Sequence, residues 1–185
     1  METSLILRER ASEPLVKHTV PLGHYQVVAF ATHGLMAGEI PGFAEPALLL
    51  TPPDQANPDN DGLLAASEIA QLKLNAEWVI LSACNTAAAD GTPGAEGLSG
   101  LAKAFFYAGS RALLVSHWPV ASDTTVTLTT HMFNEAKANP TIGRAEAHRR
   151  AMLALINDPN TTHPSYWAPF VVVGEGGTYR PQPIP

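Results

Sequence analysis

Residues 26–32, QVVAFAT, and residues 77–83, EWVILSA, are two short runs that are apolar along almost their entire length and rich in β-branched and aromatic side chains. Runs of this length and composition are typical of strands buried on both faces of a parallel sheet. His33 follows the first run directly, and Cys84 follows the second. Because a single crossover connects the two runs, we expect neighbouring, parallel strands.

The rest of the chain continues this pattern. Two further apolar runs lie at residues 111–116 and 168–173. Helical patterns, several of them with a capping Ser or Thr, lie at residues 67–74, 96–108, 122–138 and 141–156. Strands that alternate with helices predict an α/β fold with a mostly parallel sheet covered by helices.

The length of 185 residues fits one domain that spans residues 1–185. Within it, we expect residues 1–24 to form a short lead and residues 174–185 to form a loose tail. The proline- and glycine-rich residues 34–66 are interpreted as an insertion loop with a short edge strand or hairpin.

Charge and composition limit the possible partners. The chain has 11 Lys and Arg against 17 Asp and Glu, a net charge of −6, and no basic run that would attract nucleic acid or an anionic membrane. No stretch approaches the ~20 apolar residues that a membrane span needs. We therefore expect a protein that binds neither nucleic acid nor membrane. Because a single cysteine excludes an internal disulfide framework, we also expect it to be cytoplasmic.

His33 and Cys84 are candidates for a catalytic pair. Each follows a strand of the predicted parallel sheet, so both are expected at its carboxyl edge, where open α/β sheets bind ligands. Cys84 comes 51 residues after His33, which is the order and spacing of caspases. A thiolate is the nucleophile that such chemistry needs, and an imidazole can take its proton. The backbone N–H groups of Gly34 and Cys84 are candidate oxyanion donors. The alternative is a buried structural cysteine and an unrelated histidine.

A loop with calcium-like spacing and one histidine are further candidates for binding sites. The residues Asn57, Asp59, Asp61, Gly62 and Glu68 have the spacing of an EF-hand loop, but prolines replace the helix that should lead into it, and a solvated turn is the favoured interpretation. His117 follows the strand at 111–116 and is interpreted as a structural histidine in preference to a pocket residue. The remaining histidines lack ligand spacing, so we predict no metal and no cofactor.

Several motifs in order along the chain resemble those of one known family. They are ATHG at residues 31–34, DGLL at 61–64 with SEI at 67–69, LSACNT at 81–86, EGL at 96–98, SHWPV at 116–120 and YWAPF at 166–170. This series resembles the CHAT domain, a caspase-like family often fused to TPR repeats, from about Tyr25 to Gly174.

The resemblance implies a caspase-hemoglobinase fold with helices on both faces of the sheet. It also implies a cysteine endopeptidase that cleaves a protein or peptide partner through His33 and Cys84, under the control of TPR-type domains or proteins. Family members usually carry further strands before the ATHG motif, so we expect this chain to lack them or to be part of a longer protein. The alternative function is a catalytically silent interaction or scaffold module.

The same resemblance suggests two substrate-binding residues. Metacaspases carry an acid two residues before the nucleophile, a position that Ser82 occupies in this chain. Asp123 corresponds to acids near the Arg-binding pocket of the similar separase motif. An arginine side chain needs a bidentate carboxylate, which Asp123 would supply. The alternative is that Asp123 only complements the dipole of the helix that Ser122 begins.

Overall fold

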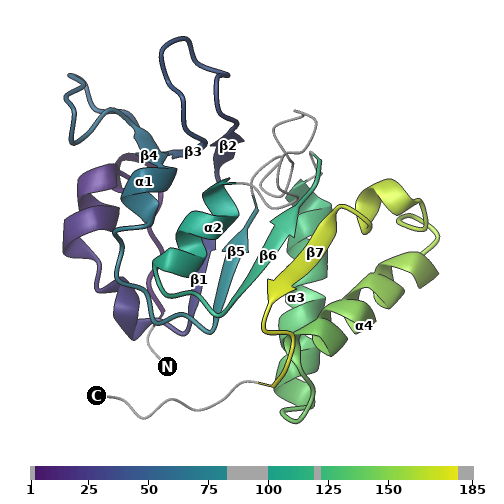
Figure 1. The fold of residues 1–185 in the computed structure, drawn as a ribbon. Helices are drawn as coiled ribbons and strands as arrows, with labels where there is room; N and C mark the ends of the chain where they lie inside the picture. The colour runs from purple at the N-terminus through teal and green to yellow at the C-terminus, as the bar shows by residue number, and fades with distance from the viewer. Residues whose placement is uncertain (1–2, 83–99, 119–121, 179–185) are drawn as a thin grey trace.

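The structure is a computed structural model that describes residues 3–82, 100–118 and 122–178 (Figure 1). Its centre is a four-stranded sheet with the strand order β1-β5-β6-β7. The strands are β1 (Val27–Phe30), β5 (Trp78–Leu81), β6 (Ala112–Ser116) and β7 (Phe170–Gly174). They coincide with the four apolar runs of the sequence. Burial on both faces holds for the central strands β5 and β6, whereas Ala29 of the edge strand β1 is exposed and β7 is mostly half-buried.

The first three strands are parallel, and β7 is antiparallel to β6. In the β1–β5 pair, Val27 lies opposite Trp78 and Phe30 lies opposite Leu81. The predicted neighbouring, parallel arrangement of these two strands is therefore confirmed. The carboxyl ends of β1, β5 and β6 meet at one edge of the sheet.

One face of the sheet packs against α2 (Gly100–Tyr107) and α1 (Ala66–Ile69). Val79 and Leu81 of β5 belong to this core, and the ring of Phe30 lies 5.4 Å from that of Phe105 of α2. Four residues of α2 are buried, Leu101, Ala102, Ala104 and Phe105, so the helix presents one apolar face to the sheet. The helix predicted at 96–108 is present over its described part.

The opposite face packs against α3 (Ser122–Ala138) and α4 (Arg144–Asn157). The alternate residues of β5, Trp78 and Ile80, belong to this second core, and the Trp78 ring lies 5.7 Å from that of Phe133 of α3. Because side chains of a strand alternate between faces, β5 is buried on both sides. Helices thus cover both faces, as Figure 1 shows.

A smaller antiparallel sheet has the order β2-β3-β4. It consists of β2 (His33–Leu35), β3 (Ala47–Leu49) and β4 (Leu63–Ala65). Leu48 and Leu64 are fully buried in the same core as α2, so the small sheet is packed onto the main body of the molecule. The region 33–65 therefore holds three short strands.

Two predicted helices differ from the observed ones. The helix predicted at 67–74 ends at Ile69. Residues 71–76 alternate between exposed and buried positions, which is the two-residue period of an extended chain and not of a helix. The helix predicted at 141–156 begins only at Arg144. The amides of Arg144 and Ala145 donate to the carbonyls of Gly177 and Gly176, so the described part of the tail caps this helix.

Short helical turns complete the fold. They are η1 (Arg8–Arg10), η2 (Leu15–Thr19), η3 (Leu22–His24) and η4 (Pro164–Tyr166). The first three belong to the N-terminal segment, which lies beside α1 and β4 in Figure 1. Among the helices of the described residues, none is long and apolar enough to span a membrane.

A buried ionic network lies at the amino edge of the main sheet. Glu77, directly before β5, binds Arg144 of α4, and both side chains are almost completely buried. Arg111 binds the same carboxylate at 3.1 Å. Arg144 also donates to the carbonyls of Glu175 and Gly177 at 3.2 and 3.3 Å. This network joins β5, α4 and the start of the tail at the end of the sheet opposite the predicted site.

Candidate active site

The carboxyl edge of the main sheet brings together residues that follow three adjacent parallel strands. His33 follows β1, Ser82 follows β5, and His117 and Trp118 follow β6. This edge is where open α/β sheets place their ligands. Residues far apart in the sequence therefore gather where the sequence predicted a site.

His33 is exposed and begins β2, three residues after the last residue of β1. It lies opposite Leu49 in the small sheet, and the hydroxyl of the preceding Thr32 donates to the Leu49 carbonyl. Gly34 follows in β2, opposite Leu48. His33 thus lies at the junction of the two sheets, with its backbone in the smaller one.

Ser82 is half-buried and directly follows β5. Its backbone N–H donates to the Phe30 carbonyl at 2.9 Å, so the β1–β5 pairing continues to this residue. Cys84 lies outside the described residues. By sequence, Cys84 is the third residue after Leu81, just as His33 is the third residue after Phe30, the partner of Leu81.

His117 is exposed, in contrast to the structural histidine that the sequence suggested. Its backbone N–H donates to the Pro169 carbonyl at 3.0 Å, which continues the β6–β7 pairing. The next residue, Trp118, is 40% exposed. The sequence signal that would have favoured a site position is that both follow the buried strand next to β5.

Asp123 lies in the first turn of α3 and is exposed. Its Oδ1 accepts the backbone N–H of Thr124 at 2.8 Å, and its carbonyl accepts the Thr127 hydroxyl at 2.9 Å. A carboxylate in the first turn also complements the helix dipole. These contacts agree with the interpretation that Asp123 stabilises the start of the helix. Among the described residues, none forms a hydrogen bond with Oδ2, so this oxygen is available to a ligand.

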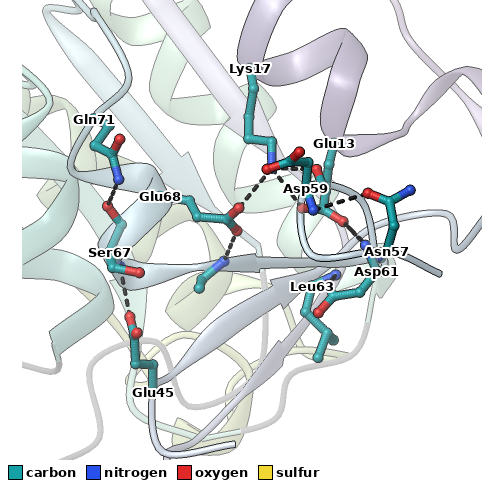
Figure 2. A network of polar contacts seen from close by, with 12 residues as sticks. Glu13, Lys17, Glu45, Asn57, Asp59, Asp61, Leu63, Ser67, Glu68 and Gln71 are labelled. Carbon is teal, nitrogen blue, oxygen red and sulfur yellow. Dashed lines mark hydrogen bonds and ion pairs between the residues drawn. The ribbon is translucent and has the colours of Figure 1, made fainter.

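The residues with EF-hand-like spacing, 57–68, bind the ammonium group of Lys17. The Lys17 ammonium of η2 donates to Glu68 at 2.7 Å, to the Asp59 carbonyl at 2.6 Å and to Glu13 at 3.1 Å (Figure 2). The other Glu68 oxygen accepts the Ala65 N–H at 2.9 Å. Partial burial lowers the pKa of Lys17, but the hydrogen bonds that its ammonium donates to Glu68 and Glu13 outweigh this effect and raise the pKa above its usual value.

A comparison with family models matches the CHAT domain over residues 2–175. The chain belongs to the CHAT domain family. The match covers both sheets and all four α-helices of the described structure, so this CHAT domain includes the carboxyl edge with His33, Ser82 and His117.

Two curated proteins are similar to this CHAT domain. Tetratricopeptide repeat protein 28 of Mus musculus is 34% identical over 116 residues, and the protein of the same name from Homo sapiens is 31% identical over 116 residues. In each case the aligned region is 60% of this chain but 4% of the relative. The chain thus matches a small part of two much longer proteins.

Proposed function

We propose that this CHAT domain is a cysteine endopeptidase that cleaves a protein partner, with His33 and Cys84 as its catalytic dyad. The observation that carries the proposal is the exposed His33 at the carboxyl end of β1, beside the strand that leads to Cys84. Membership of a caspase-like family supports the same chemistry. The fold we propose is the caspase-hemoglobinase fold, with residues 1–185 as one domain.

The register of β1 and β5 supports the dyad. Phe30 and Leu81 are paired, and His33 and Cys84 each come three residues later in their own chain segments. Neighbouring parallel strands lie only about 4.8 Å apart. Two segments that leave such strands at the same level begin close together, which suits a nucleophile and a base that act on one bound peptide.

The proposed reaction has two steps. His33 takes the proton of the Cys84 thiol, and the thiolate attacks the carbonyl carbon of the scissile peptide. As the C–N bond breaks, the imidazolium returns the proton to the leaving amine, and an acyl-enzyme forms. Water, deprotonated by His33, then hydrolyses the thioester and restores the thiol. The N–H groups of Gly34 and Cys84 are proposed to bind the oxyanion.

Ser82 and Asp123 are proposed to border the pocket for the residue before the scissile bond. Ser82 lies at the end of β5, two residues before the proposed nucleophile. Asp123 lies in the first turn of α3, which follows β6, the next strand of the sheet. An exposed carboxylate in this position suits a basic side chain, because guanidinium and carboxylate form paired hydrogen bonds.

The relatives' names support a regulatory partner of the tetratricopeptide repeat class. We propose that such repeats, on the same polypeptide or on another protein, control access of the substrate to the dyad. No cofactor or metal is needed for the proposed reaction, since a thiolate and an imidazole supply the nucleophile and the proton transfers.

Alkylation of Cys84 by iodoacetamide across pH tests the dyad. Cys84 is the only cysteine of the 185 residues, so the mass increase reports on this thiol alone. We expect rapid alkylation with a midpoint well below the ~8.5 of a free thiol, because an imidazolium stabilises the thiolate. His33→Ala should return the midpoint to the ordinary range.

The matched control is His131→Ala, which removes an exposed histidine of α3. It should leave the alkylation profile unchanged. An ordinary thiol midpoint in the unmodified domain, unaffected by His33→Ala, would instead favour the alternative function, an interaction or scaffold module without chemistry.

A further inference from the structure

The N-terminal segment is bonded to the part of the chain that carries His33. Glu13, whose side chain is only 1% exposed, accepts the backbone N–H groups of Asp61 and Gly62 with the same oxygen, at 2.7 and 2.6 Å. Its other oxygen binds the Lys17 ammonium at 3.1 Å. A buried carboxylate with these partners fixes the loop that precedes β4, as Figure 2 shows.

This loop is connected to His33 by an unbroken series of backbone contacts. The Gly62 carbonyl accepts the N–H of Leu50 at 2.8 Å. Leu50 directly follows β3, whose last residue, Leu49, is paired with His33 in β2. Between the Glu13 carboxylate and His33 there are therefore only Gly62, the end of β3 and one strand pairing.

A second set of contacts reinforces the same connection. The Thr51 N–H donates to the Ala11 carbonyl at 2.8 Å, and the Thr51 hydroxyl donates to the Arg8 carbonyl at 2.7 Å. Gly62 has a φ of +89°, and an added Cβ would lie 2.9 Å from the Cα of Pro52, so the loop is tightly packed against the chain after β3. The N-terminal segment thus binds both ends of the loop that joins β3 and β4.

We infer that Glu13 is a positioning residue for His33, which it holds through the Gly62 loop and β3. The inference rests on the function proposed above. His33 is exposed and belongs to a strand of only three residues, so its place depends on β3, the strand with which β2 is paired. A mutation far from the reacting atoms that misplaces them by about 1 Å can cost about 100-fold in rate.

Two substitutions test this inference. Glu13→Ala leaves the N–H groups of Asp61 and of the buried Gly62 without their acceptor, whereas Glu13→Gln keeps an oxygen at this position. Leu155→Ala is the matched control, because it weakens the core on the opposite face of the main sheet, away from the small sheet. Each variant is compared with the unmodified domain by two measurements.

The first measurement is amide hydrogen exchange. Glu13→Ala loses the hydrogen bonds of the Glu13 carboxylate to Asp61 and Gly62. For each lost bond, amide exchange in residues 33–35 and 47–49 should accelerate by about tenfold. Glu13→Gln should exchange more slowly than Glu13→Ala in these residues. Leu155→Ala should not show this selective acceleration in β2 and β3. Unchanged exchange at residues 33–35 in Glu13→Ala would overturn the inference.

The second measurement is the pH profile of Cys84 alkylation, which a general loss of stability does not shift. Glu13→Ala should move the midpoint toward that of His33→Ala, Glu13→Gln should restore it, and Leu155→Ala should leave it unchanged. A His33-dependent profile that Glu13→Ala does not alter would overturn the positioning role and leave the proposed dyad standing. If the unmodified domain has an ordinary, His33-independent profile, the dyad fails, and the exchange measurement alone decides whether Glu13 holds β2.

Discussion

The backbone N–H of Ser82 donates to the carbonyl of Phe30 at 2.9 Å, one residue beyond the last paired residue of β5. This bond fixes the two strands in register up to the carboxyl edge of the sheet. Beyond it, the chain after β1 turns into the small sheet at His33. The register of the main sheet and the anchorage of the small sheet therefore together determine where His33 lies.

Cys84→Ala is expected to abolish peptide cleavage and to leave the fold intact. The substitution removes a single sulfur atom and keeps the backbone and Cβ of the residue. Cleavage of a peptide library, with far-ultraviolet circular dichroism as the measure of folding, provides the check. Cleavage that persists in this variant would contradict the assignment of the nucleophile, whatever the state of its fold.

Glu77→Gln should lower the free energy of unfolding strongly. It removes the charge that pairs with Arg144, whose side chain is completely buried, and breaking a buried ion pair from one side typically costs about 3–5 kcal/mol. Urea unfolding provides the measurement. The control is Glu146→Gln, which changes solvent-accessible ion pairs with Arg149 and Arg150 and should lower the unfolding midpoint far less.

His148 should make the stability depend on pH below neutrality. Burial lowers its pKa from 6.5 to about 4, and its Nε2 has no hydrogen-bond partner in the described part of the chain. As the pH falls below 6.5, the unfolded chain binds a proton that the folded His148 refuses until about pH 4. The free energy of unfolding should therefore decrease by up to about 3 kcal/mol across this window and change no further below it on account of this group.

His148→Leu replaces the titrating imidazole on α4 with an apolar side chain that can fill the buried position. Its unfolding midpoint should depend less on pH between 6.5 and 4 than that of the unmodified domain. His131→Leu, at an exposed position of α3, serves as the control and should retain the full dependence. Equal slopes for the two variants would contradict the role given to His148.

The sequence was sufficient to predict the strands of the main sheet, but of the small sheet it predicted only a short edge strand or hairpin within residues 34–66. The runs around β1 and β5 are long enough to be identified as buried strands, and one crossover determines that they are neighbours. By contrast, β3 and β4 contain three residues each and form through pairings with distant parts of the chain. A run of three residues is too short for its periodicity to define the bounds of a strand or its pairing partners.

The network around Lys17 was beyond sequence reasoning for a related reason. Spacing alone suggested calcium for residues 57–68, and it gave no sign that an ammonium group 51 residues before Glu68 would bind there. The position of His33 near the carboxyl end of β1 could be predicted, because it directly follows the apolar run at residues 26–32. The support that Glu13 gives to the small sheet is not, because its contacts are 48 and 49 residues away.

Calcium should not stabilise the unmodified domain, because the Lys17 ammonium already binds the Glu68 carboxylate and the Asp59 carbonyl. A bound ion raises the melting temperature by mass action, so thermal unfolding with millimolar calcium or with a chelator measures this directly. Lys17→Met should lower the melting temperature in both conditions, since it leaves two carboxylates close together without a counter-charge. A calcium-dependent rise in the unmodified domain would contradict this account of the loop.

Asp123 is expected to select a basic residue before the scissile bond. It is exposed at the start of α3, and only Oδ1 has a hydrogen-bond partner among the described residues, so the carboxylate retains an acceptor and its charge. In peptides with Arg, Lys, Asp or Leu at this position, Asp123→Ala should reduce kcat/KM for Arg by about tenfold or more, because a charge-assisted hydrogen bond contributes about 1.5–3 kcal/mol. Asp123→Asn should keep an acceptor for the Thr124 N–H, and with it much of the helix start, while losing the preference for Arg. An effect confined to stability and equal for all four peptides would mean that Asp123 serves only the helix, and a preference of the unmodified domain for Asp would exclude the pocket role.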